Sequence, residues 1–212
     1  KNGKSIALVS DAGMPLISDP GELLVNEARK ASLEVITIPG PCAAITALVC
    51  SGLPNSKFIF YGFLPKSGKG RVQILNSIST SKLTSIIYES PKRILKLLFQ
   101  LKELCGNSRR ISISKELTKK YEQNIGSNLE DAINYFHNNK PIGELTIIIS
   151  PNEEIQNIKE EKAEINFLRE ELKELIKAGL SHSSASIYLS KKYKKPKNKV
   201  YNLLLNDNCT KV

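Results

Sequence analysis

The chain has 212 residues, and the 41% that are hydrophobic can form one large core or two small ones, which excludes a wholly disordered protein. The 31 Lys and Arg exceed the 21 Asp and Glu and give a net charge of +10, which favours a polyanionic partner, either nucleic acid or a membrane surface. The four cysteines form no CxxC pair, and no apolar run reaches the roughly 20 residues of a membrane span, so we expect a cytoplasmic protein with reduced thiols, no metal and no membrane anchor.

The N-terminal part alternates apolar runs with stretches of helical spacing. In chain order we expect a strand over residues 6–9, a helix over 20–31, a strand over 35–38 and a helix over 42–49. Short apolar runs that stop at Gly and Pro are typical of buried parallel strands, and Asp19 before Pro20 is a typical helix start. The β-α-β-α order predicts a mainly parallel sheet. Because the chain starts at Lys1 and reaches the first strand within a few residues, we also expect it to be a fragment.

The same alternation continues to residue 149. We expect strands over 58–64, 85–88, 110–114 and 143–149, a Gly-rich basic loop over 65–71, and helices that end near 78 and cover 91–104 and 129–137. Polar residues from 151 to about 164 predict a solvated linker, followed by helices over 167–177, 181–188 and 197–205. The predicted fold is therefore α/β, with two α/β domains over residues 1–62 and 63–152 and a linker and basic helical domain over 153–212.

Three loops are candidates for a ligand site because each follows a predicted strand. They read SDAGMP from Ser10, PGPCAA from Pro39 and YESP from Tyr88. Ligands bind at the carboxyl ends of parallel strands, where free backbone N–H groups converge. Small residues allow close backbone approach, and Asp11 offers an acceptor for an ammonium or hydroxyl group. Taken singly, each loop is better explained as an ordinary turn, but their order and spacing together indicate a site.

Five segments together resemble one family. They read SDAGMPLISDPG from Ser10, PGPCAAITAL from Pro39, YESPKR from Tyr88, KELTK from Lys115 and GE from Gly143. With them the chain resembles the ribosomal RNA small subunit methyltransferase I family of the tetrapyrrole methylase superfamily, over residues 6 to 150. The resemblance implies a two-domain enzyme with an incomplete N-terminal domain here, usually a homodimer. Such an enzyme binds S-adenosyl-L-methionine between its domains and methylates the 2′-oxygen of a cytidine ribose in 16S rRNA of the small ribosomal subunit.

The resemblance also assigns roles to residues of the matching motifs. The cofactor-binding residues would be Ser10, Asp11, Ala12, Gly13, Met14, Cys42, Ala43, Glu89, Leu117, Glu144 and Leu145. Methyl transfer needs a general base for the hydroxyl proton, for which we nominate Glu116 or Lys115. A buried ion pair that holds two domains together explains the KELTK motif nearly as well. A nucleophilic Cys42 is disfavoured, because no His lies in a matching motif to activate it.

The chain departs from the family in three places. Met14 stands where Thr is usual, Lys92 stands where His is common, and the Gly-rich N-terminal strand and turn are missing. The first two changes are compatible with the fold. The third predicts an incomplete cofactor cleft.

Basic residues in two places predict contacts with RNA phosphates. The candidates are Lys66, Lys69, Arg71, Lys92, Arg93 and Lys119 in the α/β part, and Lys191, Lys192 and Lys195 in the helical part. A solvated lysine tail explains the last three about as well. Tyr188 and Tyr201, which lie among the lysines, are better explained by core packing than by base stacking.

Two other functions are compatible with the sequence. A tetrapyrrole methylase acting on a corrin or porphyrin precursor would share the fold and the cofactor, but an acidic small molecule does not require the basic tail. A non-enzymatic RNA-binding protein would keep the fold and not bind the cofactor. Cofactor binding and the identity of the methylated substrate separate the three.

Overall fold

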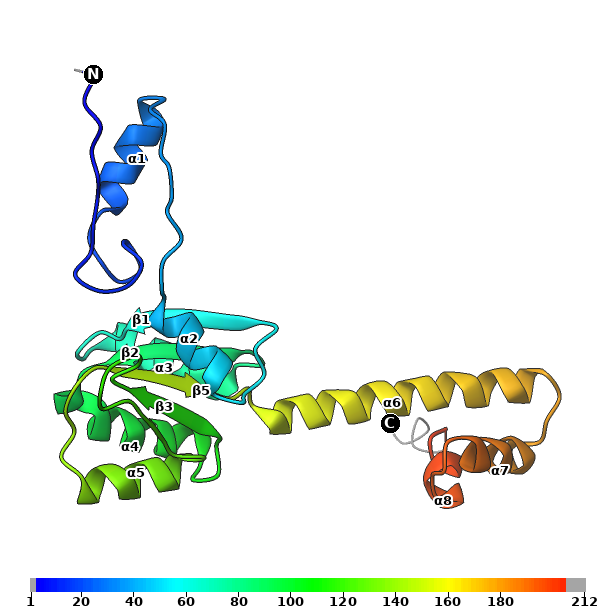
Figure 1. Ribbon diagram of the computed structural model, residues 1–212. Helices are drawn as coiled ribbons and strands as arrows, with labels where there is room; N and C mark the ends of the chain where they lie inside the picture. Colours follow the sequence, from blue (N-terminus) through cyan, green and yellow to red (C-terminus); the bar gives the residue numbers. More distant parts are fainter. Residues whose placement is uncertain (1–2, 205–212) are drawn as a thin grey trace. The chain divides into compact units, whose positions relative to one another are not determined.

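The computed structural model describes residues 3–204, except the side chains of residues 154–163. It divides into two compact units, Lys1–Asn152 and Glu153–Val212, which are described separately (Figure 1). The first unit combines helices with a sheet and the second is helical, which confirms the α/β class with a helical C-terminal part. The domain boundary expected at residue 62 stays a prediction, and strand β1, Phe58–Phe63, has residues on both sides of it.

The first unit places a sheet between helices. Its elements are α1 (Glu22–Lys30), α2 (Ala43–Cys50), β1, α3 (Lys69–Thr80), β2 (Thr84–Glu89), the 3-10 helix η1 (Pro91–Arg93), α4 (Ile94–Cys105), β3 (Ile111–Lys115), β4 (Gln123–Ile125), α5 (Leu129–Asn138) and β5 (Leu145–Ile149). Most of the expected strands and helices between residues 42 and 149 are present with small shifts of their ends. The short strand β4 was not predicted.

The sheet is mixed, so the prediction of a mainly parallel sheet is wrong. Its strand order is β1-β2-β5-β3-β4, in which only β1 and β2 form a parallel pair. The reason is that β5 lies between β2 and β3 and pairs antiparallel with both. β2 and β3 therefore run in the same direction but are not neighbours in the sheet. The ends of β2 and β3 and the start of β5 therefore meet at one edge, where Glu89 and Lys115 both pair with Leu145.

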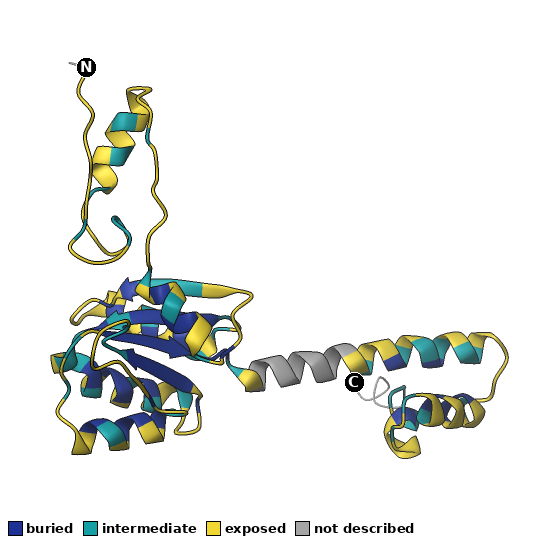
Figure 2. Cartoon of the chain, in the orientation of Figure 1, coloured by how far each residue is buried: buried dark blue, intermediate teal, exposed yellow. Residues whose placement is uncertain are grey.

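The strands expected over residues 6–9 and 35–38 are not formed, which corrects both predictions. Ile6, Val9, Ile36 and Ile38 are 77–82% exposed, and Figure 2 shows the segment before α2 as mostly exposed. A strand is stable only when its backbone pairs with a neighbour, and within the described residues the sheet ends at β1. Helix α1 between the two stretches does form, but it begins at Glu22 with Gly21 as its N-cap and no side-chain cap, so the expected start at Asp19 and Pro20 is wrong.

Helices cover both faces of the sheet. On one face α3, α4 and α5 bury Ile87, Ile147 and Ile149, and on the other face α2 packs on Ile86 and Ile148. Side chains alternate between the faces of a strand, so neighbouring isoleucines of β2 and β5 enter different cores. This two-sided burial explains why both strands carry isoleucines at consecutive positions, Ile86 and Ile87 in β2 and Ile147 to Ile149 in β5.

The second unit contains three helices within the described residues, α6 (Glu153–Lys177), α7 (His182–Lys192) and α8 (Lys197–Tyr201). Their core consists of Leu172, Ala185, Leu189 and Val200. The linker expected over residues 151–164 stays a prediction, and most of this segment is helical because α6 already begins at Glu153. Glu, Lys, Gln and Ala are strong helix formers, so a polar composition suits an exposed helix as well as a linker.

Two general expectations concern membranes and thiols. Among the residues that the structure describes, no helix is both long and apolar enough to cross a bilayer. Cys42, Cys50 and Cys105 are free thiols, and the fourth cysteine, Cys209, lies outside the described residues.

Candidate functional site

The candidate site lies at the edge of the sheet where β2 and β3 end and β5 begins. Glu89 closes β2, Lys115 closes β3 and Glu144 precedes β5. The antiparallel pairing of β5 brings these residues together although 55 positions separate Glu89 from Glu144 in the sequence. The YESPKR, KELTK and GE motifs therefore share one edge. The antiparallel pairing of β5 brings them together there, and not the parallel sheet that was expected.

Glu89 sits in a buried charge cluster beneath this edge. Its side chain is fully buried, with Oε1 2.6 Å from a terminal nitrogen of Arg93 and Oε2 3.8 Å from a terminal nitrogen of Arg71. The N–H of Ser90 also donates to Oε1, at 2.8 Å. Arg71 donates further to Gln100 and to the carbonyl of Pro65. The cluster ties the Pro65 loop to the end of β2, so Glu89 acts in the structure as an internal anchor.

Glu116 follows β3 and ties the KELTK segment to the start of β5. Its Oε1 accepts a hydrogen bond of 2.8 Å from the N–H of Glu144, and its own N–H donates to the Glu144 carbonyl. Lys119 Nζ lies 3.3 Å from carboxylate oxygens of both Glu116 and Glu144. The Glu144 N–H lowers the pKa of Glu116 most, followed by Lys119, and hydrogen bonds to Glu144 and Glu116 raise the pKa of Lys119. Glu116 is therefore held as a carboxylate.

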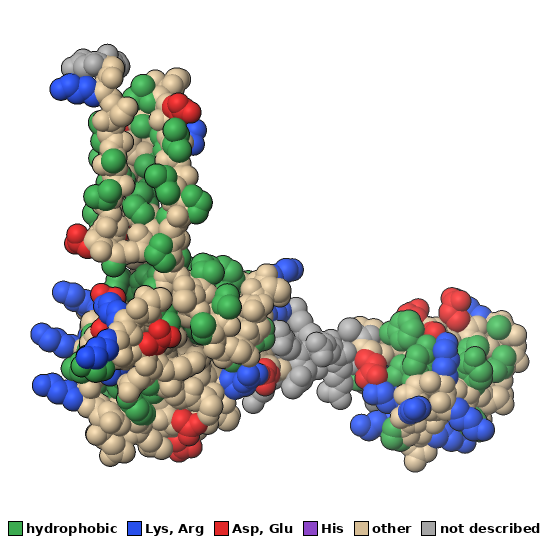
Figure 3. All heavy atoms as spheres, in the orientation of Figure 1, with side chains coloured by type: hydrophobic (Ala, Val, Ile, Leu, Met, Phe, Trp, Pro, Cys, Tyr) green, Lys and Arg blue, Asp and Glu red, His purple; other side chains and the backbone are tan. Residues whose placement is uncertain are grey.

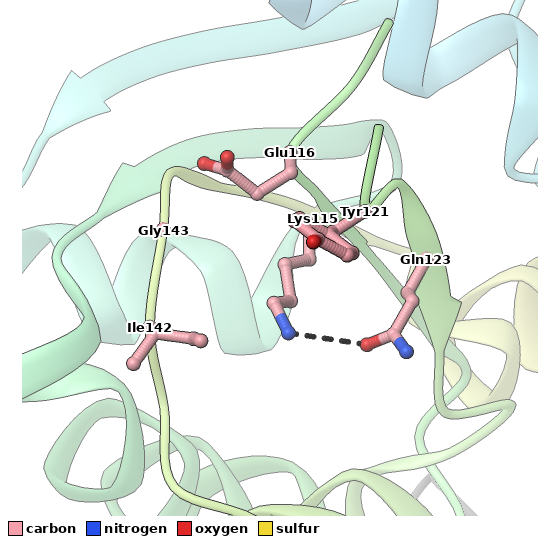
Figure 4. Close-up of a pocket in the computed structure, with 6 residues that line it drawn as sticks. All are labelled: Lys115, Glu116, Tyr121, Gln123, Ile142 and Gly143. Carbon is pink, nitrogen blue, oxygen red and sulfur yellow. Dashed lines mark hydrogen bonds between the residues drawn. The ribbon is translucent and has the colours of Figure 1, made fainter. Parts of the chain in front are cut away.

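A pocket of about 260 Å³ opens beside this tie (Figure 4). Its lining residues are Lys115, Glu116, Tyr121, Gln123, Ile142 and Gly143. Lys115 Nζ donates to Gln123 Oε1 at 3.2 Å, and the Tyr135 hydroxyl donates to the same oxygen at 2.9 Å. Both residues nominated as general base thus border one pocket. Lys115 presents an ammonium donor there, and Glu116 presents a carboxylate that is already hydrogen-bonded.

The two N-terminal loops of the predicted cofactor site lie against each other. A Cβ on Gly13 would lie 3.2 Å from the Pro41 carbonyl oxygen, and one on Gly40 would lie 3.6 Å from the sulfur of Met14. Ser10 Oγ donates to the Ala12 carbonyl at 3.1 Å. Asp11, Ala12, Gly13 and Ala43 are exposed, and Ser10, Met14 and Cys42 are half-buried. Small residues at this contact leave backbone groups open to a bound molecule.

Tyr88 is a site residue that the sequence reasoning missed. Its hydroxyl accepts a 3.0 Å hydrogen bond from the N–H of Ala44 in the first turn of α2. Burial, with a smaller contribution from Cys42, raises the pKa of Tyr88. The ring packs on the core under α2, on which Cys42 and Leu117 also pack, so the PGPCAA loop, the YESP segment and the KELTK segment share this core. Its position at the start of YESP was the available signal.

The predicted cofactor residues differ in what they expose. Cys42 and Leu117 both pack on the core under α2. Glu144 has a side chain that is 78% exposed, whereas Leu145 is buried in the core on the α4 face. Leu145 and the buried Glu89 can therefore offer a ligand only backbone groups.

The basic candidates of the first unit fall into two groups. Lys66, Lys69 and Lys92 are exposed, at the Gly-rich loop and at η1. Arg71 is only 3% exposed and Arg93 is paired with Glu89, so neither guanidinium is presented to a phosphate. Lys119 is engaged by two carboxylates. Three exposed lysines thus remain as candidates for phosphate contact at this edge.

The basic candidates of the second unit also divide. Lys192 Nζ lies 3.1 Å from Glu171, and Lys195 Nζ lies 2.8 Å from Glu164. Contacts with Tyr193 and then with Glu171 raise the pKa of Lys192 above its ordinary range. Lys191 is exposed and has no carboxylate within ion-pair distance among the described side chains. In the described part of the chain, no three His, Cys, Asp or Glu residues gather as a metal site would require.

Comparisons with known proteins agree with this arrangement. Residues 1–133 match the family described as Tetrapyrrole (Corrin/Porphyrin) Methylases. A protein of Synechocystis sp. named Ribosomal RNA small subunit methyltransferase I is 42% identical over 205 residues, which are 96% of this chain and 72% of that protein. The protein of the same name from Thermotoga maritima is 43% identical over 153 residues, which are 72% of this chain and 68% of that one. The crystal structure of the methyltransferase CobJ matches 66% of this chain and 62% of its own, with a TM-score of 0.51 and 17% identity, and shows similarity of fold alone.

Proposed function

Because the chain belongs to the ribosomal RNA small subunit methyltransferase I family of tetrapyrrole methylases, we propose that it methylates RNA of the small ribosomal subunit with S-adenosyl-L-methionine. In the finer proposal, the acceptor is the 2′-oxygen of a cytidine ribose in 16S rRNA. The observation that carries the proposal is 42% identity across nearly the whole chain to a protein of that name. A cytoplasmic location and a homodimer stay predictions.

The residues of the two N-terminal loops fit S-adenosyl-L-methionine. Gly13, at φ +75°, approaches the Pro41 carbonyl so closely that a side chain there would crowd the contact. Such bare backbone suits a ligand held by N–H and carbonyl groups, and the exposed Asp11 carboxylate suits its ammonium group. We propose that Ser10 to Met14 hold the methionine part, with Cys42 and Ala43 beside it. Leu117, Glu144 and the backbone of Leu145 would complete the site.

The bound cofactor supplies an electrophilic methyl group on a sulfonium. The chain must then orient the ribose hydroxyl in line with that methyl group, and solvent water would take up the hydroxyl proton. Glu116 is held as a weakly basic carboxylate by the Glu144 N–H, so we propose that it mainly positions Gly143 and Glu144. Lys115 offers hydrogen-bond donors at the pocket and would stabilise negative charge on the substrate.

RNA would approach the same edge through exposed lysines. Lys66 and Lys69 lie on the loop that Arg71 anchors, and Lys92 lies on η1 beside Arg93. Internal pairing of the arginines fixes these backbones, and the lysines remain open to solvent. We propose that the lysines contact phosphates while the buried Arg71–Glu89–Arg93 cluster keeps them in place.

The test is methyl transfer from labelled S-adenosyl-L-methionine to small subunits that lack the modification, followed by mapping of the methylated nucleotide. A 2′-O-methyl group on a cytidine of 16S rRNA is the expected result. Methylation of a base, or transfer to a corrin or porphyrin precursor in place of RNA, would contradict it. Cofactor binding by calorimetry without transfer to any of these substrates would equally oppose the proposed reaction.

A pair of variants tests the RNA approach. Lys66→Gln with Lys69→Gln should raise the KM for the small subunit, because two phosphate contacts are lost. Lys102→Gln, in the last turn of α4 and so near the opposite edge of the sheet, is the control with a lysine-to-glutamine change. Because the control removes one charge and the double variant two, an effect of the control that is half that of the double variant would show that total charge alone matters.

A further inference from the structure

The last two described helices form a strongly one-sided charge arrangement in the second unit. Residues 178–204 contain six lysines, at positions 191, 192, 194, 195, 197 and 199, and no Asp or Glu. The acidic side chains described in this unit lie on α6, for example Glu164 and Glu171. Figure 3 shows Lys and Arg side chains gathered over this part of the unit.

Ion pairs remove two of the six lysines from the free surface. Glu171 engages Lys192 and Glu164 engages Lys195, so both ammonium groups are held against α6. The Tyr193 hydroxyl donates to Glu171 at 2.8 Å, and the Lys192 ammonium lies 4.9 Å from the Tyr193 ring centre. These two lysines therefore help to fix α7 on α6.

The other four lysines are exposed and point to a separate role. Lys191, Lys194, Lys197 and Lys199 have no carboxylate within 4.0 Å among the described side chains. They occupy the end of α7, the turn after it and the short helix α8. Tyr188, which was expected in the core, is instead 52% exposed on α7, so an aromatic ring stands on the same helix.

The backbone at Lys194 supplies an independent observation. Lys194 has φ +51° at the position that follows the cap residue of α7, and the N–H of Lys195 donates to the Ser190 carbonyl at 3.0 Å. This is a Schellman-type helix end, in which glycine usually takes the left-handed position. A side chain there is unfavourable for an L-residue. Lysine at this position provides a charge but holds an unfavourable backbone conformation. Residues in unfavourable backbone conformations cluster at functional sites.

We propose that Lys191, Lys194, Lys197 and Lys199 form a phosphate-binding surface that holds the RNA substrate, and that Lys192 and Lys195 are structural. The proposal rests on the proposed function, because RNA is the substrate inferred there. It replaces the sequence-based choice of Lys191, Lys192 and Lys195. The small exposed apolar area beside the lysines, Ile187 and Tyr188, favours RNA over a lipid surface, which needs a broad apolar face.

Two double variants with the same change of net charge test the proposal in the full-length protein. Lys191→Gln with Lys197→Gln removes two surface lysines, and Lys192→Gln with Lys195→Gln removes two paired lysines. Binding to 16S rRNA is measured from 50 to 200 mM salt. A slope of about 0.7 per phosphate contact on single strands predicts that the first variant lowers the slope by about 1.4, whereas the second leaves it nearly unchanged. Equal loss in both variants, or no loss in either, would overturn the proposal.

Lys194→Gly provides a readout that unfolding cannot imitate. Glycine relieves the left-handed backbone, so the unfolding temperature of the second unit should rise by a few degrees. RNA affinity should nevertheless fall, with a slope smaller by about 0.7. A more stable variant with unchanged RNA binding would refute a role for this lysine.

Two further measurements separate this proposal from the proposed function. Binding is measured without cofactor, and methyl transfer is measured in parallel. If methyl transfer is normal and the two double variants bind RNA equally well, only the proposed phosphate-binding surface is refuted. If the Lys191→Gln, Lys197→Gln variant alone loses RNA binding but no methyl transfer is detected with any protein, only the proposed reaction is refuted. Vesicles of anionic phospholipid should bind weakly, and preference for vesicles over RNA would refute the choice of partner.

Discussion

The buried carboxylate of Glu89 allows a quantitative prediction about stability. Glu89→Gln keeps the shape of the side chain but removes the charge that faces Arg71 and Arg93. The Glu89 and Arg71 side chains are 0% and 3% exposed, so water cannot replace the lost partner. Breaking a buried pair by removing one partner costs about 3–5 kcal/mol, since an uncompensated charge stays in the core. We expect a loss of that size in the free energy of unfolding.

Urea unfolding followed by circular dichroism measures the loss, because the chain has no Trp to report by fluorescence. The control is Glu27→Gln, which breaks the exposed pair with Lys30, whose side chains are 58% and 64% exposed. An exposed pair contributes about 0–1 kcal/mol. If Glu89→Gln costs no more than this control, the cluster is solvated and the reasoning is wrong. In the Glu89→Gln background, Arg71→Met should lower the free energy of unfolding far less than it does in the unchanged protein. The Arg71 guanidinium has already lost its counter-charge in that background.

Three further predictions concern the ties at the strand ends. The pKa of Glu116 is lowered in the folded state, so its carboxylate stabilises the fold relative to Glu116→Gln. This stabilisation is fully present above pH 4.5 and is lost as the pH falls through the folded pKa. A difference in urea midpoints between the two proteins that does not change between pH 3 and 7 would contradict this. Tyr88→Phe leaves the N–H of Ala44 without its acceptor and should cost about 1–3 kcal/mol, measured by urea unfolding, whereas an unchanged midpoint would show that the N–H finds another partner. Gly143→Ala places a Cβ 2.5 Å from Glu116 Oε1 at φ +80° and should cost about 1–3 kcal/mol, with a less than additive loss when combined with Glu116→Gln.

Local sequence pattern predicts the elements of the first unit better than their arrangement. The consecutive isoleucines of β2 and β5 are buried on both faces of the sheet, as consecutive apolar residues in a strand indicate. The position of β5 between β2 and β3 depends on pairing between segments that are far apart in the sequence, and no local pattern encodes it. β4 escaped prediction because Gln123, Asn124 and Ile125 form a short, polar edge strand.

The N-terminal segment and the basic tail also show that local pattern does not predict which distant residues will be partners. Ile6 and Ile38 have the apolar character of strand residues, yet a strand forms only where a neighbouring backbone offers hydrogen bonds. The motif reasoning placed Glu89, Lys115 and Glu144 in one region, and the structure brings them to one edge. It did not distinguish exposed lysines from paired ones, because the partners Glu164 and Glu171 lie more than 20 residues away in the sequence.

The central place of β5 has a consequence for how the protein is synthesised. Before residues 145–149 leave the ribosome, the pairs available from the described sheet are β1 with β2 and β3 with β4, which are two separate two-stranded pieces. Two-stranded sheets are marginal in water. The nascent chain therefore gains its cooperative core in one late step, when the last strand fills the gap. A ribosome stalled before that point should hold a chain that proteases digest readily, and one stalled well beyond it a resistant chain.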